Sequence, residues 1–321
     1  MKNKGIIIFL IALAAIIIAV IAGDYISKRP DKMSPNPFDY DINEFRKVKE
    51  ELILYKETKN FKVGFDEPAG ITIANEKIYL VGDNKLKIID FTGKLLVEIE
   101  LSDKPQTVES TVDKIYIAFE KQIQVFNEVG ELLQEWAFLD DNSYITAVSV
   151  LDENVYVADA GTRKIMRYTL DGKKLNEFNG KTDEEGLVGF IVPSPYFDMD
   201  INEDGDLWVV NPGMHSLENF NIDGSLRTYW KNSGIKTEGF SGCCNPAHFT
   251  FLPDGSFVTS EKGLVRIKTY KPSGEFSGVV AAPNKFKNEV DGEAPDVAVD
   301  MSGNIYALDF DKKVLRVFEL K

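Results

Sequence analysis

Length, composition and charge set the first limits on what this protein is. The chain has 321 residues, 44% of them apolar, so it can bury a large core and disorder is excluded as its main state. Its formal net charge is −14, which excludes general affinity for nucleic-acid phosphates, because such binding requires clustered Lys and Arg.

Residues 1–24 predict an N-terminal signal-anchor or transmembrane helix. Lys2 and Lys4 precede an uncharged run from residue 5 to 23. At ~1.5 Å of rise per residue, this run reaches roughly the ~30 Å of the hydrocarbon layer, whereas a cleaved signal has an apolar region of about 7–15 residues. An uncleaved anchor is therefore favoured, and cleavage after Ala22 is the alternative.

The same lysines predict the orientation of the chain. They favour a cytoplasmic N-terminal end, so the rest of the chain is expected to be extracytoplasmic, in a bacterial periplasm or at a cell surface. Residues 25–46 then predict a flexible tether, because Pro30, Pro35 and Pro37 interrupt any helix. The folded domain is expected over residues 47–321.

A repeated phrase indicates the architecture of that domain. PAGITIANEKIYLVGDNKLKIIDFTGKLLVEIEL, which begins at residue 68, is followed by five variants, and a complete copy has four short runs of period-two alternation. Prolines and tyrosines recur at one separation in three copies, at Pro68 and Tyr79, Pro105 and Tyr116, and Pro295 and Tyr306. Repetition every ~40–50 residues with four strands per unit predicts an all-β fold, a six-bladed β-propeller.

The last copy is one strand short, and the apolar run 52–55 precedes the first copy without a blade of its own. We expect this N-terminal strand to complete the last blade and close the ring, which removes an open sheet edge.

Two phrases, VYVADAGTRKIMRYTLDGK and GNIYALDFDKKVLRVFE, resemble the NHL-repeat family of propellers. The resemblance covers nearly everything after residue 50 and implies a binding platform more often than an enzyme. GCCNP followed by PDGSFVTSEKG is also similar to a bacterial membrane-attached subgroup of NHL proteins without an assigned activity.

Several polar positions are predicted to serve turns. Residues 200–205, DINEDG, match the first half of a calcium loop, but the twelfth position is Asn211 instead of Glu, and other copies carry ordinary hairpin signals at this place. We therefore predict a hairpin, with a cation site as the alternative. Polar residues that follow the second strand of their copies are expected to cap turns, with Arg163 and Arg266 as structural neighbours: Asp159, Asn211, Glu261 and Asp309.

Both cysteines of the chain, Cys243 and Cys244, stand side by side in SGCCNPAHF. With no other thiol in the chain, they can be free, bonded to each other in a strained ring, or bonded to a partner protein. The structural interpretation is a vicinal disulfide that stiffens one turn.

The propeller topology suggests a second interpretation of these cysteines. The connection between blades opens on the same face as the hairpin between strands two and three of a blade. This places Cys243 and Cys244 near Met214 and His215, and His248 follows in the next inner strand, with alternate residues pointing into the channel. Thiolate, imidazole and thioether suit a soft metal, copper or zinc, and a vicinal dithiol can alternatively cycle by thiol exchange.

Long inter-blade connections at 180–194 and 281–294 are candidate recognition loops. The first is unusually apolar, and we predict partner binding by Leu187, Val188, Phe190 and Ile191. A loop that folds down over its own blade is the alternative.

Two functions follow from these observations. The first is a membrane-anchored extracytoplasmic propeller, monomeric in itself, that binds or assembles another envelope or membrane protein. The second is a soft-metal-binding or thiol redox protein that uses the Cys243–Cys244 pair. No G-x-S-x-G elbow or P-loop is present, and two histidines are too few for the metal site of an NHL-type amidating lyase, so no catalytic residue is predicted.

Overall fold

The computed structural model describes residues 3–27, 42–136, 140–182, 188–286 and 292–321. It divides into two compact units, Met1–Glu44 and Phe45–Lys321. The first unit contains helix α1 (Asn3–Ser27), whose stretch Lys4–Ile26 has the length and composition of a membrane span, criteria that an N-terminal signal sequence also meets. The helix ends at Ser27 instead of residue 24. Most of the predicted tether lies outside the described residues, and the single-turn helix α2 (Ile42–Phe45) follows it.

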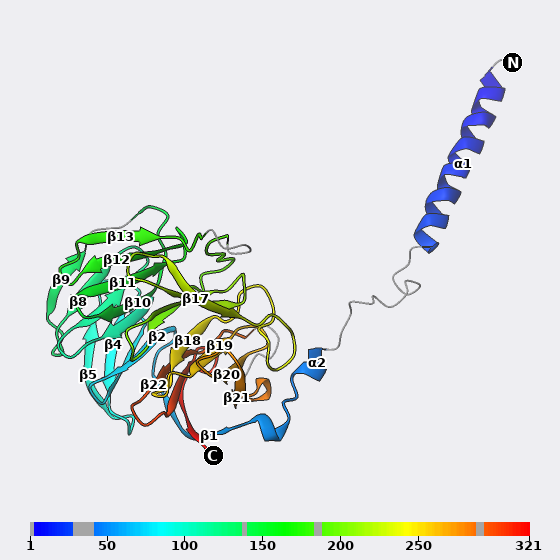
Figure 1. Cartoon of the computed structure of the whole chain (residues 1–321). Coiled ribbons are helices and arrows are strands. Elements are labelled where there is room, and N and C mark those ends of the chain that lie inside the picture. Colours follow the sequence, from blue (N-terminus) through cyan, green and yellow to red (C-terminus); the bar gives the residue numbers. More distant parts are fainter. Residues whose placement is uncertain (1–2, 28–41, 137–139, 183–187, 287–291) are drawn as a thin grey trace. The chain divides into compact units, whose positions relative to one another are not determined.

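The second unit is the predicted six-bladed β-propeller, with six four-stranded antiparallel sheets (Figure 1). The first three blades are β2 (Pro68–Ala74), β3 (Lys77–Gly82), β4 (Lys85–Ile89) and β5 (Leu95–Glu100); β6 (Thr107–Ser110), β7 (Ile115–Ala118), β8 (Ile123–Phe126) and β9 (Leu132–Trp136); and β10 (Ile145–Leu151), β11 (Asn154–Asp159), β12 (Lys164–Thr169) and β13 (Lys174–Phe178). The last three are β14 (Met199–Ile201), β15 (Leu207–Asn211), β16 (Ser216–Phe220) and β17 (Leu226–Lys231); β18 (His248–Phe251), β19 (Phe257–Glu261), β20 (Arg266–Tyr270) and β21 (Phe276–Ala281); and β22 (Asp296–Val299), β23 (Ile305–Asp309), β24 (Val314–Leu320) and β1 (Tyr55–Lys62). Two short 3₁₀ helices, Glu50–Leu52 and Pro283–Lys285, flank the last two blades.

The burial of the strands explains why the repeat is needed. The second strand of a blade, such as β7 with the sequence IYIA, is buried along its whole length, whereas the outer strand β9 exposes both of its leucines. A central strand that is apolar on both faces needs a covering sheet on each side, and only the neighbouring blades can provide one.

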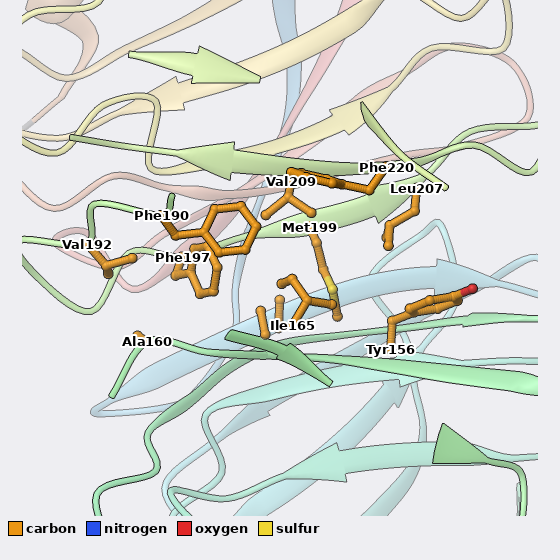
Figure 2. Packing of buried hydrophobic residues seen from close by; sticks show 12 residues of the cluster. Tyr156, Ala160, Ile165, Phe190, Val192, Phe197, Met199, Leu207, Val209 and Phe220 are labelled. Atoms are coloured by element: carbon orange, nitrogen blue, oxygen red, sulfur yellow. The ribbon is translucent and has the colours of Figure 1, made fainter. Parts of the chain in front are cut away.

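The core accordingly consists of six hydrophobic clusters, one at each interface between neighbouring blades. The cluster between the third and fourth blades contains Ile165 and Met199, with Phe190 and Phe197 packed against them (Figure 2). Full burial of one such side chain contributes about 1.5–3 kcal/mol.

The ring is closed as predicted, by an N-terminal strand in the last blade. Strand β1 pairs with β24, and Figure 1 shows it beside the C-terminus. The Arg316 guanidinium binds the Glu57 carboxylate across this pair, at 2.6 and 3.2 Å. The strand begins later than the apolar run suggested: Ile53 and Leu54 contact Val279 of the fifth blade instead.

Candidate functional site

The inner strands of the six blades line a central channel with a cavity of about 200 Å³. Two layers of residues face it, because alternate residues of a strand point to the same side. The deeper layer pairs in register with one position of the second strands, which is aromatic in every blade except the fifth, where it is Val258. The members of this layer are Thr72, Glu109, Ser149, Asp200, Thr250 and Ala298. The layer nearer the cysteine side includes Thr107, Asp198, His248 and Asp296.

Carboxylates dominate this channel, and burial keeps part of them protonated. Burial raises the pKa of Glu109 to about 8, helped by the charge of Asp200, and raises that of Asp200 to about 7. Burial also raises the pKa of Asp296 to about 6, against the opposing effect of His248. At neutral pH the deeper layer therefore holds protons that a cationic group would displace.

His248 stands between two carboxylates. Its Nδ1 lies 3.6 Å from Asp198 Oδ2 and 3.7 Å from Asp296 Oδ1. Burial lowers the pKa of His248, but the hydrogen bond that its ring donates to Asp198 and the two negative charges outweigh this effect and raise the pKa. Its Nε2 is buried and has no hydrogen-bond partner among the described residues.

The same carboxylates join neighbouring blades. Asp198 accepts a hydrogen bond from the Phe249 amide of the next blade at 2.9 Å, and Asp296 accepts one from the Ile71 amide at 3.0 Å. These bonds satisfy backbone donors at the blade joints, so the two residues have a structural role whatever the channel binds.

The connection from β17 to β18, residues 232–247, carries both cysteines and is called the cysteine loop here. It lies on the face that holds the inter-blade connections and the hairpins between second and third strands, which we call the inter-blade face. The Asn232 amide donates to the His215 carbonyl of such a hairpin, which confirms the shared face.

A buried charge cluster fixes the first half of the cysteine loop. Glu261, Arg266 and Lys268 of the fifth blade have fully buried side chains. Arg266 binds both oxygens of Glu261, at 3.1 and 2.8 Å, and also donates to the carbonyls of Lys236 and Gly239. The Lys268 ammonium bridges Glu261 and Gly239 at 2.8 and 2.7 Å. A bidentate arginine pair of this kind holds its neighbours in a defined geometry.

Asn245 fixes the second half of the cysteine loop. Its side chain donates to the carbonyls of Ser241 and Lys262 and accepts from the Lys262 amide, at 2.6, 3.1 and 2.9 Å. Its own carbonyl accepts a hydrogen bond of 2.8 Å from the ring of His215. Asn245 is 2% exposed, so the residue after the cysteines is a buried anchor.

The two thiols lie against this anchor and are both free. Their Sγ atoms are 3.1 Å apart, with Cys243 exposed and Cys244 buried. Ser194 hydrogen-bonds to Cys244, and the Lys262 ammonium donates to Ser194 at 3.3 Å. Lys262 also lies 5.0 Å from the ring centroid of Tyr196.

A cavity of about 270 Å³ adjoins the channel and shares Asp198 and His248 with it, which makes it the mouth of the channel. Its wall combines the aromatic rings of Tyr144, Tyr196 and Phe310 with the charged side chains of Lys104 and Glu293. Burial and the nearby Glu293 carboxylate raise the pKa of Tyr196 to about 12, so its phenol is a hydrogen-bond donor at any physiological pH.

The structure brings the predicted soft-metal residues to one face but not into one ligand set. The ring of His215 contacts the Asn245 backbone, Met214 lies in the same hairpin as His215, and His248 contacts the channel carboxylates. In the described ranges, no group of three or more His, Cys, Asp or Glu is arranged to hold a metal ion. A copper or zinc site here stays a prediction.

The predicted partner loop divides between surface and core. Leu187 lies outside the described residues, and Val188 is 64% exposed. Phe190 is only 5% exposed and packs on Phe197 and Phe220, as Figure 2 shows. Ile191 packs on Gly213, where a Cβ atom would lie 2.4 Å from its side chain. Among the described residues of the predicted partner set, Phe190 and Ile191 therefore pack on the propeller, and Val188 is presented to solvent.

Two of the four predicted capping residues, Asp159 and Asp309, cap turns. The Asn211 side chain instead accepts a hydrogen bond from the Ile191 amide, and Glu261 pairs with Arg266 and Lys268. Asp159 accepts backbone hydrogen bonds from residues 144, 161 and 162, and Asp309 accepts one from Lys312. Asn202 and Gly205 form a hairpin, which Asp200 precedes in the channel wall.

Sequence reasoning missed the carboxylates of the channel. Glu109 and Asp200 stand opposite Tyr116 and Trp208, aromatic positions that mark the repeat, so the alignment of copies already contained the signal. The residues that pair with this aligned position on the inner strand of each blade form the deeper layer, so they could have been identified from the aligned copies.

Comparisons with known proteins support the fold. No family model matches the chain, and no curated protein matches it. A streptogramin B lyase structure is 16% identical with a TM-score of 0.59, covering 85% of this chain and all of that one. Virginiamycin B lyase from Staphylococcus aureus is 16% identical with a TM-score of 0.56, over 83% and 100%. A structural-genomics protein of unknown function from Bacteroides thetaiotaomicron is 14% identical with a TM-score of 0.59, over 83% and 72%. At these identities the likeness shows the propeller fold alone, and the NHL resemblance stays a resemblance.

Proposed function

We propose that this protein is a membrane-anchored extracytoplasmic binding module whose partner, an envelope protein, docks on the inter-blade face and inserts a basic side chain into the channel mouth. The carrying observation is the cavity of about 270 Å³, where three aromatic rings surround an opening that leads to buried carboxylates.

The size of the cavity favours a side chain over a small-molecule ligand. Pockets for drug-sized ligands usually measure about 300–1,000 Å³, so this mouth is at or below the lower limit. A single long side chain or a short peptide segment matches it better. The rim is formed by loops on a rigid propeller, which is the usual setting of a recognition surface.

Charge and ring chemistry favour a basic group. Glu293 and Asp198 line the cavity, and the Lys104 ammonium, which also lines it, is paired with the Glu67 carboxylate at 2.6 Å. Aromatic faces attract cations, and Lys262 already places its ammonium over the Tyr196 ring. Phe310 and Tyr144 offer further rings to an incoming lysine or arginine.

The apolar helix α1 supports the anchored location. Its composition suits a membrane span, and the lysines before it favour a cytoplasmic N-terminal end. Protease added to intact spheroplasts should digest the propeller only if it is outside. Protection that ends only on lysis would place the propeller in the cytoplasm and refute this part of the proposal.

Site-specific photo-crosslinking in membranes tests the docking face. A photoreactive amino acid replaces Phe310 at the mouth, and in the matched control it replaces Met301, which is 85% exposed in the β22–β23 turn at the other end of the channel. We expect a defined adduct from position 310 alone, joined to a segment with Lys or Arg. Changing that basic residue to Gln should weaken binding at least tenfold. Equal adducts from both positions, or a segment without a basic residue, would contradict the proposal.

A further inference from the structure

The two cysteine sulfurs are poised for bond formation. Their separation of 3.1 Å is about 1 Å more than a disulfide bond, which measures about 2.05 Å. Asn245 and the Glu261–Arg266 pair hold the loop on both sides of the thiols, so the short distance belongs to a supported segment of backbone.

The environments of the two thiols differ in a way that assigns them different roles. Cys243 is exposed and can be reached by a second molecule, whereas Cys244 is 1% exposed and its sulfur lies 3.1 Å from that of Cys243. Burial raises the pKa of Cys244, and the Ser194 hydrogen bond and the Lys262 charge oppose that rise. The exposed thiol is therefore suited to attack, and the buried one to resolve the product.

We infer that Cys243 and Cys244 form a thiol–disulfide exchange site that reduces a low-molecular-weight disulfide and becomes a vicinal disulfide. This inference does not rest on the binding function proposed above, since it requires only the geometry of the two thiols and their neighbours.

The reaction proceeds in two balanced steps. The Cys243 thiolate attacks one sulfur of the disulfide RS–SR, so a Cys243–SR bond forms, the RS–SR bond breaks and RS⁻ leaves. Cys244 then gives its proton to RS⁻ and attacks the Cys243 sulfur, so the Cys243–Cys244 bond forms and a second RS⁻ leaves, to be protonated by water. Two protein thiols are oxidised, and one disulfide is reduced to two RSH.

Lys262 and Ser194 support the second step. Lys262 donates a hydrogen bond to Ser194, and Ser194 hydrogen-bonds to Cys244. The Ser194 hydroxyl therefore links the Lys262 ammonium to the buried thiol. This chain stabilises the Cys244 thiolate when its proton has left. Lys262 is thus a positioning residue for resolution and does not contact the incoming disulfide.

The full-length protein in mild detergent allows a direct test with oxidised glutathione. The reduced protein is mixed with the reagent, quenched with acid and analysed by intact and peptide mass spectrometry. We expect the wild type to lose two hydrogens, retain no glutathione and release two glutathione thiols per chain. Cys244→Ser should stop at a stable glutathione adduct on Cys243. Cys243→Ser should react at least tenfold more slowly than the wild type.

Lys262→Met separates the two steps. The first step should keep its rate, whereas the adduct on Cys243 should persist several-fold longer than in the wild type, and thermal unfolding confirms that each variant is folded. A wild-type protein that accumulates the Cys243 adduct with Cys244 still reduced, or that does not react, would overturn the inference. A Cys243→Ser variant that reacts at the wild-type rate would overturn the assigned roles.

Discussion

Removing one negative charge should test how the cysteine loop is held. In Glu261→Gln, the fully buried Arg266 loses both of its carboxylate contacts, at 3.1 and 2.8 Å, and Lys268 loses one at 2.8 Å. Breaking a buried ion pair by removing one partner costs about 3–5 kcal/mol, because the remaining charge is left without compensation. A domain of this size loses about 2–4 °C of Tm per kcal/mol, so we expect Tm to fall by roughly 6–20 °C.

Thermal unfolding of the full-length protein followed by tryptophan fluorescence provides the assay. Trp230 packs on Phe240 and Tyr270 beside the charge cluster, so its emission reports on this region. The matched control is Glu275→Gln, which breaks the exposed pair with Lys271 and should change stability by less than about 1 kcal/mol. A Glu261→Gln variant as stable as this control would refute the reasoning.

Replacing Lys268, the lysine that pairs with Glu261, should affect stability differently from Glu261→Gln. Burial lowers the pKa of Lys268 to about 7, below its value near 10.5 in the unfolded chain. Between these two pH values the unfolded state binds more protons than the folded state. The contribution of Lys268 to the stability of the wild type therefore rises with pH over about 7–10.5. Lys268→Met removes the cost of burying the charge while Arg266 still pairs with Glu261, and we expect it to abolish this slope without loss of stability at pH 7. A large destabilisation would show that the ammonium is indispensable.

Three further changes examine the channel, the loop and the closure of the ring. The pKa of Glu109 is raised to about 8 in the folded state, from about 4.3 in the unfolded chain. Between these pH values the folded state binds more protons, so the protein loses stability as pH rises from about 4.3 to 8. Glu109→Gln should flatten this dependence of Tm on pH. Asn245→Ala removes the buried anchor of the cysteine loop and should accelerate alkylation of Cys244 by iodoacetamide at least tenfold, as counted by peptide mass spectrometry, whereas an unchanged rate would contradict the anchoring role. Glu57→Gln weakens the bidentate contact of Arg316 that joins β1 to β24 and should cost about 1–3 kcal/mol in denaturant unfolding, whereas a value near zero would show that backbone pairing alone closes the ring.

The fold was accessible from sequence because its signal is repeated. Four alternating runs per copy identify the blades, and the matching aromatics fix their alignment. The closing strand was located only approximately, because β1 reads YKETKNFK and most of its residues are exposed. An outer strand has one face exposed to solvent and few apolar residues. The prediction therefore placed the strand at the nearby apolar run, residues 52–55.

The site was accessible only in part. Topology placed the cysteines, Met214 and both histidines on one face, since the order of strands determines which connections share it. The burial of Phe190 was beyond sequence reasoning, because an apolar loop can face a partner or its own core with the same composition. Likewise, no pattern in SGCCNPAHF indicates that Asn245 would bind both His215 and Lys262, which depends on distant segments meeting in space.

Two carboxylates at the channel mouth have both a structural role and a proposed role in binding, so variants of them change stability as well as affinity. Asp198 and Asp296 face the opening, and each also accepts a backbone hydrogen bond from the next blade. Replacing either one leaves a buried amide without its acceptor, at a cost of about 1–3 kcal/mol, before any ligand is considered. Phe310 lines the same mouth and accepts no such backbone bond, but it packs against the hydrophobic cluster between the last and first blades, so Tm must be measured with binding in its variants. A loss of binding in Phe310→Ala with unchanged Tm therefore reports on recognition, whereas the same loss in Asp198→Ala reports first on the ring.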